Sequence, residues 1–424
     1  MKAEILTIGD ELLRGEIIDS NKAVLSERLL RLDIETRFHT SVRDNPADME
    51  DAFRRAAGRA DVILVSGGLG PTRDDLTSEV LGASFGRPLV LDAPSLAALR
   101  AFYASVGREM APNNEKQAWF PEGAEVLPNP IGTAPGFMLT VGSVVFFSLP
   151  GVPRELVRMV DEQVLPRIAA RRPPSEVVRA RLLRTFGMGE SNLDDVLKDI
   201  APSGDVTLGF RTAFPDNYLR PLARAKSANE ADAKLAHVCD AIRARLGALV
   251  YGEGDETMER VVGGLLRAQR KTIAVAESCT GGLLAERITS VPGASDYFLG
   301  GIAAYANSAK QALLGIAGSL LEREGAVSEP VAREMAERVR DRFGADLGVS
   351  TTGISGPGGG TKDKPVGLVH LALADAAGTH ADHFVFPLDR ERHRVLTVQL
   401  ALDWVRRRLL GVPLAAPTIL RRKT

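Results

Sequence analysis

The sequence predicts an α/β protein with two open α/β-sheet domains joined by a small α+β middle domain. Short apolar runs such as residues 3–8 and 61–66 alternate with helix-length segments, a spacing typical of parallel βαβ units. The same alternation starts again after residue 254, beyond a shorter stretch of mixed character. With 424 residues the chain is long enough for two or three domains of about 100–200 residues each.

The first domain is expected over residues 1–170. Asp19 or Ser20 can cap a helix that carries Leu25, Leu29 and Leu32 on one face. Further strands are expected at 36–42, 61–66 and 144–149. Further helices are expected at 46–59 and near 153–165, and Asp44 or Asn45 opens the first of these. Consecutive prolines within residues 169–175 then predict a domain boundary.

The middle domain is expected over residues 171–253 and ends in a helix at 230–246. It carries no catalytic motif. A KH-type RNA-binding module is disfavoured because no G-x-x-G loop lies between basic residues there.

The last domain is expected over residues 254–412, followed by a tail at 413–424. It opens with a helix after Thr257 and closes with a helix at 389–410. Its strands are expected at 272–276, 300–304, 347–352, 366–374 and 383–387.

Composition excludes several classes of protein. The net charge is −1, so no overall field attracts nucleic acid or an anionic membrane. The two cysteines, Cys239 and Cys279, form neither a disulfide framework nor a metal quartet. The sequence shows neither a signal peptide nor a long apolar segment, so we expect a cytoplasmic protein without membrane or nucleic-acid partners.

Two acidic, glycine-bearing loops follow strands of the first domain. Residues 66–77, S-G-G-L-G-P-T-R-D-D-L-T, begin where a buried strand ends, which is where open α/β sheets bind ligands. Glycine backbone N–H groups suit a phosphate, and the pair Asp74 and Asp75 suits a divalent metal. Residues 9–21, which include Asp10, are expected at the same edge. Either loop alone is equally typical of a tight strand–helix connection.

In the last domain, Ser278 stands in A-E-S-C-T-G-G at a strand-to-helix turn, where serine is often only a helix cap. A nucleophilic serine needs a base, and no G-x-S-x-G elbow is present. Lys310, with Tyr305, offers a base if the two strands that precede these turns are parallel. Cys279 is a rival nucleophile or simply a small packed residue.

A third loop, residues 351–359, reads T-T-G-I-S-G-P-G-G and also follows a strand. Its glycines and hydroxyls suit a phosphate or a ribose, although a flexible turn would have the same composition.

These motifs, together with N-N-E-K-Q-A at 113–118, G-T-A-P-G at 132–136 and L-P-G-V-P at 149–153, resemble the CinA (competence/damage-inducible protein A) family. The resemblance implies a molybdopterin-binding-like first domain that hydrolyses ADP-ribose to AMP and ribose 5-phosphate with Mg, Mn or Co. Asp75 takes the metal position, and Asp74, Glu79 and Asp10 are further candidates.

The last domain is similar to the nicotinamide-nucleotide amidase PncC. That resemblance implies deamidation of nicotinamide mononucleotide (NMN) to nicotinic acid mononucleotide and ammonia without a cofactor. It assigns Ser278 as nucleophile with Tyr305 and Lys310 as the activating pair, and it implies a homodimer. We expect an oxyanion hole from the N–H groups of residues 280–282. The residues expected to bind substrate are Gly67, Gly68, Gly70 and Thr72 in the first domain and Thr280, Gly281, Gly282, Asn307, Thr352, Gly353, Ser355 and Gly356 in the last.

Two other functions fit the same residues. The first domain is also consistent with a molybdopterin-binding or adenylyl-transferring protein, because that fold is shared. The whole chain is also consistent with a non-enzymatic adaptor in DNA uptake or repair.

Overall fold

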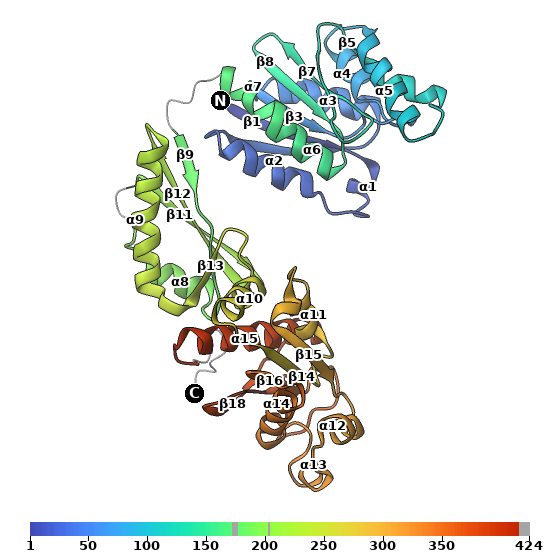
Figure 1. Cartoon of the computed structure of the whole chain (residues 1–424). Helices are drawn as coiled ribbons and strands as arrows, with labels where there is room; N and C mark the ends of the chain where they lie inside the picture. The colour runs from blue at the N-terminus through green and yellow to red at the C-terminus, as the bar shows by residue number, and fades with distance from the viewer. Residues whose placement is uncertain (172–176, 202–203, 415–424) are drawn as a thin grey trace. The chain divides into compact units, whose positions relative to one another are not determined.

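A computed structural model describes residues 1–171, 177–201 and 204–414. As far as they are described, the residues form two compact units, residues 1–179 with 224–231 and residues 180–223 with 232–424. Most of the expected proline boundary and the tail from residue 415 lie outside the described residues. Each unit is described by itself (Figure 1).

The first unit is built on a six-stranded sheet with the order β2-β1-β3-β8-β7-β6. The strands are β1 (Lys2–Ile8), β2 (Glu35–Val42), β3 (Val62–Ser66), β6 (Glu125–Leu127), β7 (Gly136–Val141) and β8 (Val144–Leu149). β2, β1, β3 and β8 are parallel, as the alternating pattern predicts. β7 is antiparallel to β8, because a short turn at Gly142 reverses the chain, and β6 is antiparallel to β7.

Helices cover both faces of this sheet (Figure 1). Alternate side chains of β1 enter different cores: Leu6 packs with Phe53, while Ile5 packs with Leu29. The helices are α1 (Asp10–Leu13), α2 (Ser20–Leu30), α3 (Pro46–Ala57), α4 (Thr77–Ser84), α5 (Ala93–Ser105), α6 (Pro153–Met159) and α7 (Leu165–Arg171). A π-helical turn, Val160–Val164, joins α6 to α7 just before Pro166, which has no N–H to donate.

The expected caps of α2 and α3 are confirmed. The Asp19 carboxylate accepts the Lys22 N–H at 3.3 Å, and the Asn45 side chain accepts those of Ala47 and Asp48. The stretch between α4 and β6 was left unassigned from sequence. It contains α5, a 3₁₀ segment (Pro112–Ala118) and a two-stranded sheet of β4 (Leu89–Leu91) and β5 (Trp119–Pro121).

In the second unit, the C-terminal part has a five-stranded sheet with the order β15-β14-β16-β17-β18. The strands are β14 (Ile273–Glu277), β15 (Phe298–Ala303), β16 (Leu347–Gly353), β17 (Leu368–Asp375) and β18 (Gly378–Val385). The expected parallel pairing of β14 with β15 is confirmed, and β16 is parallel to β14 as well. The last strand begins earlier than expected, because β17 and β18 form a tight antiparallel hairpin.

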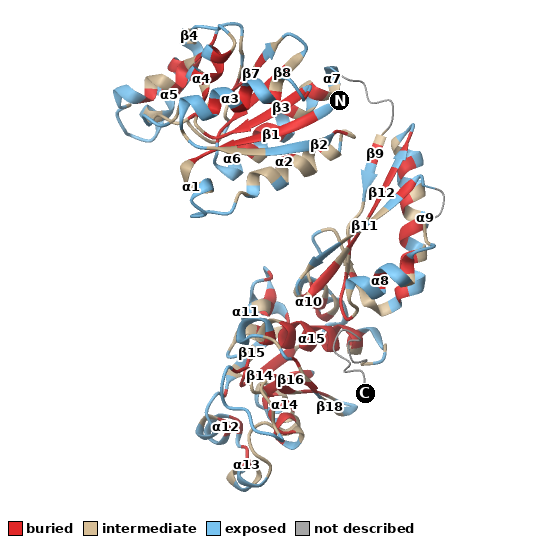
Figure 2. Cartoon of the chain, turned by 180° about the vertical axis from the view of Figure 1, so that it is seen from behind, coloured by how far each residue is buried: buried red, intermediate tan, exposed pale blue. Residues whose placement is uncertain are grey.

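Helices again cover both faces of this sheet. The long helix α15 is buried over much of its length (Figure 2), and Trp404 on α15 packs in the core over one face. Met335 on α14 packs against the other face. The helices are α10 (Met258–Gln269), α11 (Leu283–Thr289), α12 (Asn307–Leu314), α13 (Gly318–Glu324), α14 (Glu329–Phe343) and α15 (Arg390–Leu410).

Most of the middle segment, residues 180–223 and 232–253, belongs to the same compact unit as the C-terminal part, as far as these residues are described. Its elements are β9 (Val177–Ala180), β10 (Leu183–Thr185), α8 (Glu190–Leu197), β11 (Val206–Ala213), β12 (Asp216–Ala225), α9 (Ala228–Leu246) and β13 (Val250–Glu253). Phe186 and Tyr251 enter the core that contains Trp404. Asp216 also accepts hydrogen bonds from Tyr251 and Gln399 at 2.8 and 2.6 Å, so this segment is anchored to the C-terminal part.

No helix in the described parts of the chain has the length and apolar character needed to cross a membrane.

Candidate active site

Ser278 lies directly after β14, in a tight turn that leads into α11. Gly281 and Gly282 have φ values of +60° and +96°, which favour glycine. The buried carboxylate of Glu277 accepts the N–H groups of Gly282, Leu284 and Ala285 at 2.8–3.0 Å. Glu277 therefore fixes the first turn of α11, and with it the turn that carries Ser278.

Lys310 lies against this turn from α12. Its Nζ is 3.0 Å from Ser278 Oγ and donates to the carbonyl oxygens of Ala304 and Tyr305 at 2.9 and 3.2 Å. The exposed fractions of Ser278 and Lys310 are 8% and 1%. The structure thus brings these two predicted residues into contact in a site from which water is largely excluded.

Burial governs the protonation of this pair and of its neighbour. It lowers the pKa of Lys310, because a buried ammonium loses its hydration. Burial raises the pKa of the Cys279 thiol to about 12, so Cys279 is protonated at neutral pH. The thiolate is the reactive form of cysteine, and Cys279 is therefore the weaker candidate nucleophile.

Tyr305 does not meet Lys310 through its hydroxyl. The Tyr305 side chain is 61% exposed, and its hydroxyl accepts a hydrogen bond from Arg390 at 3.0 Å. Only the backbone carbonyl of Tyr305 contacts Lys310. Tyr305 lies in extended chain before α12, whereas Lys310 shares the buried face of α12 with Leu314. The expectation that the Tyr305 hydroxyl acts beside Lys310 is not supported by this geometry.

The expected oxyanion hole needs a correction. The Gly281 N–H donates to the Ser278 carbonyl at 3.2 Å, and the Gly282 N–H is taken by Glu277. Within the described part of the chain, the N–H groups of Cys279 and Thr280 have no acceptor. These two groups, immediately after Ser278, are therefore available to donate to a ligand.

The loop after β16 lies beside the Ser278 turn, because the Ser278 N–H donates to the Thr351 carbonyl at 2.9 Å. Ser355 in this loop is 5% exposed, and its hydroxyl lacks a partner among the described residues. The Thr352 hydroxyl instead donates to the Ala326 carbonyl at 2.7 Å.

The other expected substrate-binding residues of this domain have varied surroundings. The Thr280 hydroxyl is 2.6 Å from that of Thr351, and Gly353 packs so closely that a Cβ would lie 2.6 Å from the Leu368 carbonyl. The Gly356 carbonyl accepts a hydrogen bond from Arg390 at 3.0 Å. Asn307 begins α12 and is exposed.

Arg390 and Arg394 are site residues that the sequence analysis missed. Arg390 joins the Tyr305 hydroxyl to the Gly356 carbonyl, and Arg394 donates to the Thr280 carbonyl at 2.7 Å. They are one helical turn apart at the start of α15. An i, i+4 arginine pair opening the last helix is a sequence signal, but nothing local shows that this helix end reaches the Ser278 turn.

A separate pocket of about 420 Å³ lies at the carboxyl ends of β1, β3 and β8 in the first unit. The predicted residues Gly67, Gly68, Gly70, Thr72, Asp74 and Asp75 all line it. Gly67 has a φ of +109°, and a Cβ there would lie 2.3 Å from the Ile8 carbonyl. Gly67 therefore does not tolerate a side chain, whereas a Cβ at Gly70 would lie 2.5 Å from Asp75 Oδ2 and would displace the Asp75 carboxylate.

Five carboxylates line this pocket: Glu11, Asp44, Asp74, Asp75 and Glu155. Asp75 accepts the Thr72 N–H at 2.8 Å, and the Thr72 hydroxyl contacts both Asp74 and Asp75. Burial raises the pKa of Asp44, and the nearby charges of Glu11 and Asp74 raise it further. Such uncompensated negative charge is what a bound cation would relieve.

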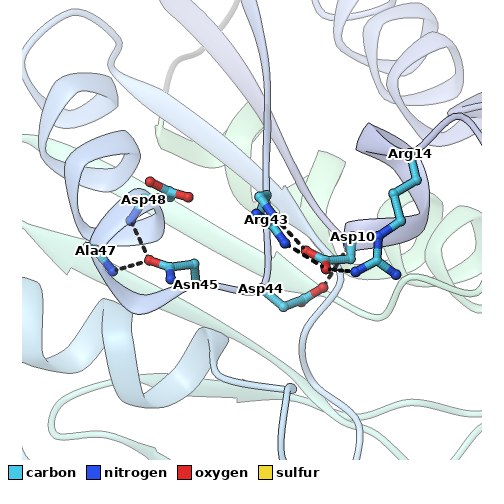
Figure 3. Close-up of polar contacts among 7 residues, drawn as sticks. All are labelled: Asp10, Arg14, Arg43, Asp44, Asn45, Ala47 and Asp48. Carbon is cyan, nitrogen blue, oxygen red and sulfur yellow. Dashed lines mark hydrogen bonds and ion pairs between the residues drawn. The ribbon is translucent and has the colours of Figure 1, made fainter.

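Asp10 lies beside Asp44 (Figure 3) but does not line the pocket. Its carboxylate pairs with Arg14 at 2.5 Å and with Arg43 at 3.2 Å, and Arg43 lowers its pKa. Its N–H donates to Asp44 at 2.8 Å. Asp10 is therefore engaged with two guanidinium groups, and Glu11 and Asp44 line the pocket in its place. Glu79 forms an ion pair with Lys116 at 3.6 Å.

The side chains fit a divalent cation that is shared with a substrate. Among the described residues, no three His, Cys, Asp or Glu side chains lie close enough to hold a metal alone. Mg²⁺ commonly binds one or two carboxylates and completes its coordination with water and substrate phosphates. The carboxylate oxygens of Asp74 and Asp75, beside the glycine loop, suit that mode of binding.

Three family models match the chain. They are a probable molybdopterin binding domain at residues 4–170, a damage-inducible protein CinA KH domain at 180–252 and a CinA C-terminal domain at 255–409. The middle match corrects the sequence-based preference against a KH-type segment. The missing G-x-x-G loop concerns how such a module would hold RNA, and it does not determine the fold.

Curated relatives match over nearly the full chain. A CinA-like protein of Anaeromyxobacter sp. (strain Fw109-5) is 46% identical, over 96% of this chain and 98% of its own length. A CinA-like protein of Geobacter sulfurreducens is 44% identical, over 97% and 100%. Among solved structures, CinA from Thermoplasma acidophilum is 33% identical with a TM-score of 0.37, over 39% of this chain and 97% of its own. MoaB from Thermus thermophilus is 24% identical with a TM-score of 0.29, over 40% and 92%.

Proposed function

Because this chain belongs to the CinA-like protein family, we propose that it is a two-site hydrolase of pyridine nucleotides and related dinucleotides. The C-terminal site deamidates NMN to nicotinic acid mononucleotide and ammonia. The observation that carries this proposal is the buried contact of Ser278 Oγ with Lys310 Nζ at 3.0 Å. A serine hydroxyl gains nucleophilic strength from an adjacent base, and the lowered pKa of Lys310 favours its neutral, basic form.

The first half of the reaction forms an acyl-enzyme. Ser278 Oγ attacks the carboxamide carbon of NMN while its proton passes to Lys310 Nζ. Two of the Lys310 N–H groups donate to the carbonyls of Ala304 and Tyr305, which leaves the lone pair of the neutral amine directed at Ser278. The N–H groups of Cys279 and Thr280 stabilise the oxyanion. The C–N bond then breaks, and the Lys310 ammonium returns the proton to the departing ammonia.

The second half releases the product. A water molecule gives a proton to Lys310 and attacks the ester carbon. The tetrahedral intermediate collapses, the ester C–O bond breaks, and Lys310 returns the proton to Ser278 Oγ. Arg390 and Arg394 supply positive charge for the phosphate of NMN, and Ser355 offers a free buried hydroxyl to the nucleotide.

Ammonia release from NMN by the purified chain tests this proposal. Ser278→Ala should abolish the release, whereas Ser290→Ala, at the exposed end of α11, should leave it unchanged. If wild type releases no ammonia, or if Ser278→Ala keeps substantial activity, the proposed amidase is wrong.

We further propose that the first unit hydrolyses ADP-ribose to AMP and ribose 5-phosphate. The glycine loop and the carboxylates of the 420 Å³ pocket support a pyrophosphate held together with a divalent cation. Asp74 and Asp75 would hold the cation, which would neutralise charge on the phosphate oxygens. The backbone of residues 67–70 orients the pyrophosphate.

The match to a probable molybdopterin binding domain keeps a second candidate open for this pocket. Direct comparison separates the two. Turnover of ADP-ribose without measurable affinity for molybdopterin supports the pyrophosphatase, and the opposite result supports a molybdopterin-binding protein.

A further inference from the structure

A second cavity of the first unit lies between α5 and the segment 126–135. Its volume is about 760 Å³, larger than that of the acidic pocket. One wall is the outer face of α5, which is mostly exposed (Figure 2) and includes Ala98 and Phe102. We call this cavity the α5 groove. The residues that line it are Asp92, Pro94, Ser95, Ala98, Leu99, Ala101, Phe102, Ser105, Val126, Pro128, Asn129, Gly132, Thr133 and Pro135.

The α5 groove adjoins the acidic pocket, because Thr133 lines both. Asn129 shapes this junction: its amide donates to the Ala134 carbonyl and to Glu155, and its carbonyl oxygen accepts the Gly132 N–H. Glu155 itself lines the acidic pocket. A single ligand with a charged centre and a neutral end would therefore occupy both cavities.

The lining of the α5 groove suits a neutral, planar group. Asp92 is its one charged lining residue among those described, and the Asp92 carboxylate already accepts the Ser95 N–H at 2.8 Å. No arginine or lysine lines it, so the groove offers nothing to a phosphate. Phe102 is 40% exposed and offers an aromatic surface for stacking.

We propose that the α5 groove binds the adenosine end of an ADP-ribose-like dinucleotide. This inference rests on the proposed pyrophosphatase and fixes the direction of its substrate. Only one end of ADP-ribose carries a neutral aromatic base. With the pyrophosphate on the glycine loop, the adenosine extends past Thr133 along α5, and the terminal ribose extends to the other side.

Filling the groove tests the proposal. Ala98→Trp places a large side chain in the groove, while Ala97→Trp places the same side chain on the same helix outside the groove lining. Both alanines are exposed. AMP and, separately, inorganic pyrophosphate with Mg²⁺ are titrated into each full-length variant by calorimetry. We expect Ala98→Trp to weaken AMP binding about tenfold or more, a change of about 1.4 kcal/mol, and Ala97→Trp to bind like wild type. Pyrophosphate binding should not change.

Truncating Phe102 provides a second test that leaves the groove open. Phe102→Ala removes the aromatic surface from an exposed position, and we expect AMP affinity to fall several-fold while pyrophosphate affinity holds. The proposal is overturned if both Ala98→Trp and Phe102→Ala bind AMP as tightly as wild type, or if wild type does not bind AMP. It is also overturned if Ala98→Trp alters only the molar mass in light scattering, because the groove would then be an interface between copies.

The hydrolysis assay separates this inference from the function on which it rests. If wild type does not cleave ADP-ribose, the pyrophosphatase is wrong, whereas AMP binding that depends on Ala98 still supports the groove. If wild type cleaves ADP-ribose and its KM is the same in Ala98→Trp, the groove assignment alone fails.

Discussion

Replacing Lys310 by arginine separates a catalytic base from a fixed positive charge. Lys310 is 1% exposed and its amine touches Ser278, so the proposed amidase relies on its neutral form. Arginine keeps the charge but is not deprotonated in the working pH range of a protein. If Lys310 is the base, Lys310→Arg should fail about as badly as Lys310→Ala.

General-base catalysis typically contributes about 10²–10⁴-fold, so we expect kcat for ammonia release to fall by about 10³-fold in both Lys310 variants. Since Ser278 and Lys310 act as a unit, the double variant with Ser278→Ala should be no slower than Ser278→Ala alone. Lys271→Arg, at an exposed position in the same domain, is the matched control and should keep full activity.

The pH profile gives an independent measure of the same base. Burial lowers the pKa of Lys310 below its ordinary value of 10.5, and the neutral amine is the active form. In wild type, kcat/KM for NMN should rise with pH through that lowered pKa and then level off. If Lys310→Arg retains much of the activity with an unchanged pH profile, Lys310 is a charge for substrate binding, and the mechanism is wrong.

Three further predictions rest on individual side chains and a fourth, on assembly, rests on the family resemblance. Tyr305→Phe should keep most amidase activity, because the Tyr305 hydroxyl contacts Arg390 and not Lys310. Cys279→Ala should do the same, because the Cys279 thiol is protonated. A loss of activity above about 10²-fold in either variant would contradict these roles. A chelator, or Asp75→Asn, should stop ADP-ribose cleavage and spare ammonia release, and equal loss of both would count against separate sites. The chain should be a homodimer, and a monomeric mass by light scattering at micromolar concentration would refute this. Burial raises the pKa of Asp216 from 3.8 to about 6, so the fold favours the protonated acid. The free energy of unfolding should therefore fall by roughly 3 kcal/mol as pH rises through this window. Urea unfolding of Asp216→Asn, which has no carboxyl group to ionise, should not show this fall.

The sheets and their main helices could be predicted because their signals are local. Buried strands read as short apolar runs, and Asp19 and Asn45 mark helix starts by capping chemistry. The strands β6 and β7 of the first sheet and the excursion from β4 to β5 do not follow from the sequence pattern, since short, partly exposed strands carry no periodicity of their own. The α5 groove could not be expected either, because residues 106–125 separate its two walls in the sequence.

For the candidate site residues, sequence predicts the edge of the sheet at which they lie but not the direction of each side chain. Parallel strands bring the turns that follow them to one edge, so sequence could place Ser278 and Lys310 at the same edge, and the glycine loop beside Asp75. Which side chain of such a turn faces inward depends on the residue at which the next helix begins, and a difference of one or two residues changes it. Lys310 and Leu314 are four apart on α12, so the helical period puts both on its buried face. Tyr305 precedes that period and faces outward.

The same argument applies to Asp10 and Glu11, adjacent carboxylates with different surroundings. Asp10 meets Arg14 four residues later on the same turn of chain, and Arg43 reaches it from the end of β2. These two guanidinium groups compensate its charge, which leaves Glu11 to line the pocket with Asp44. The Arg14 contact is an i, i+4 pair that the sequence displays, whereas the Arg43 contact requires the pairing of β1 with β2. A carboxylate near a glycine loop is therefore a stronger metal candidate when its own hydrogen bonds come from neutral groups, as those of Asp75 come from Thr72, than when guanidinium groups pair with it, as they do with Asp10.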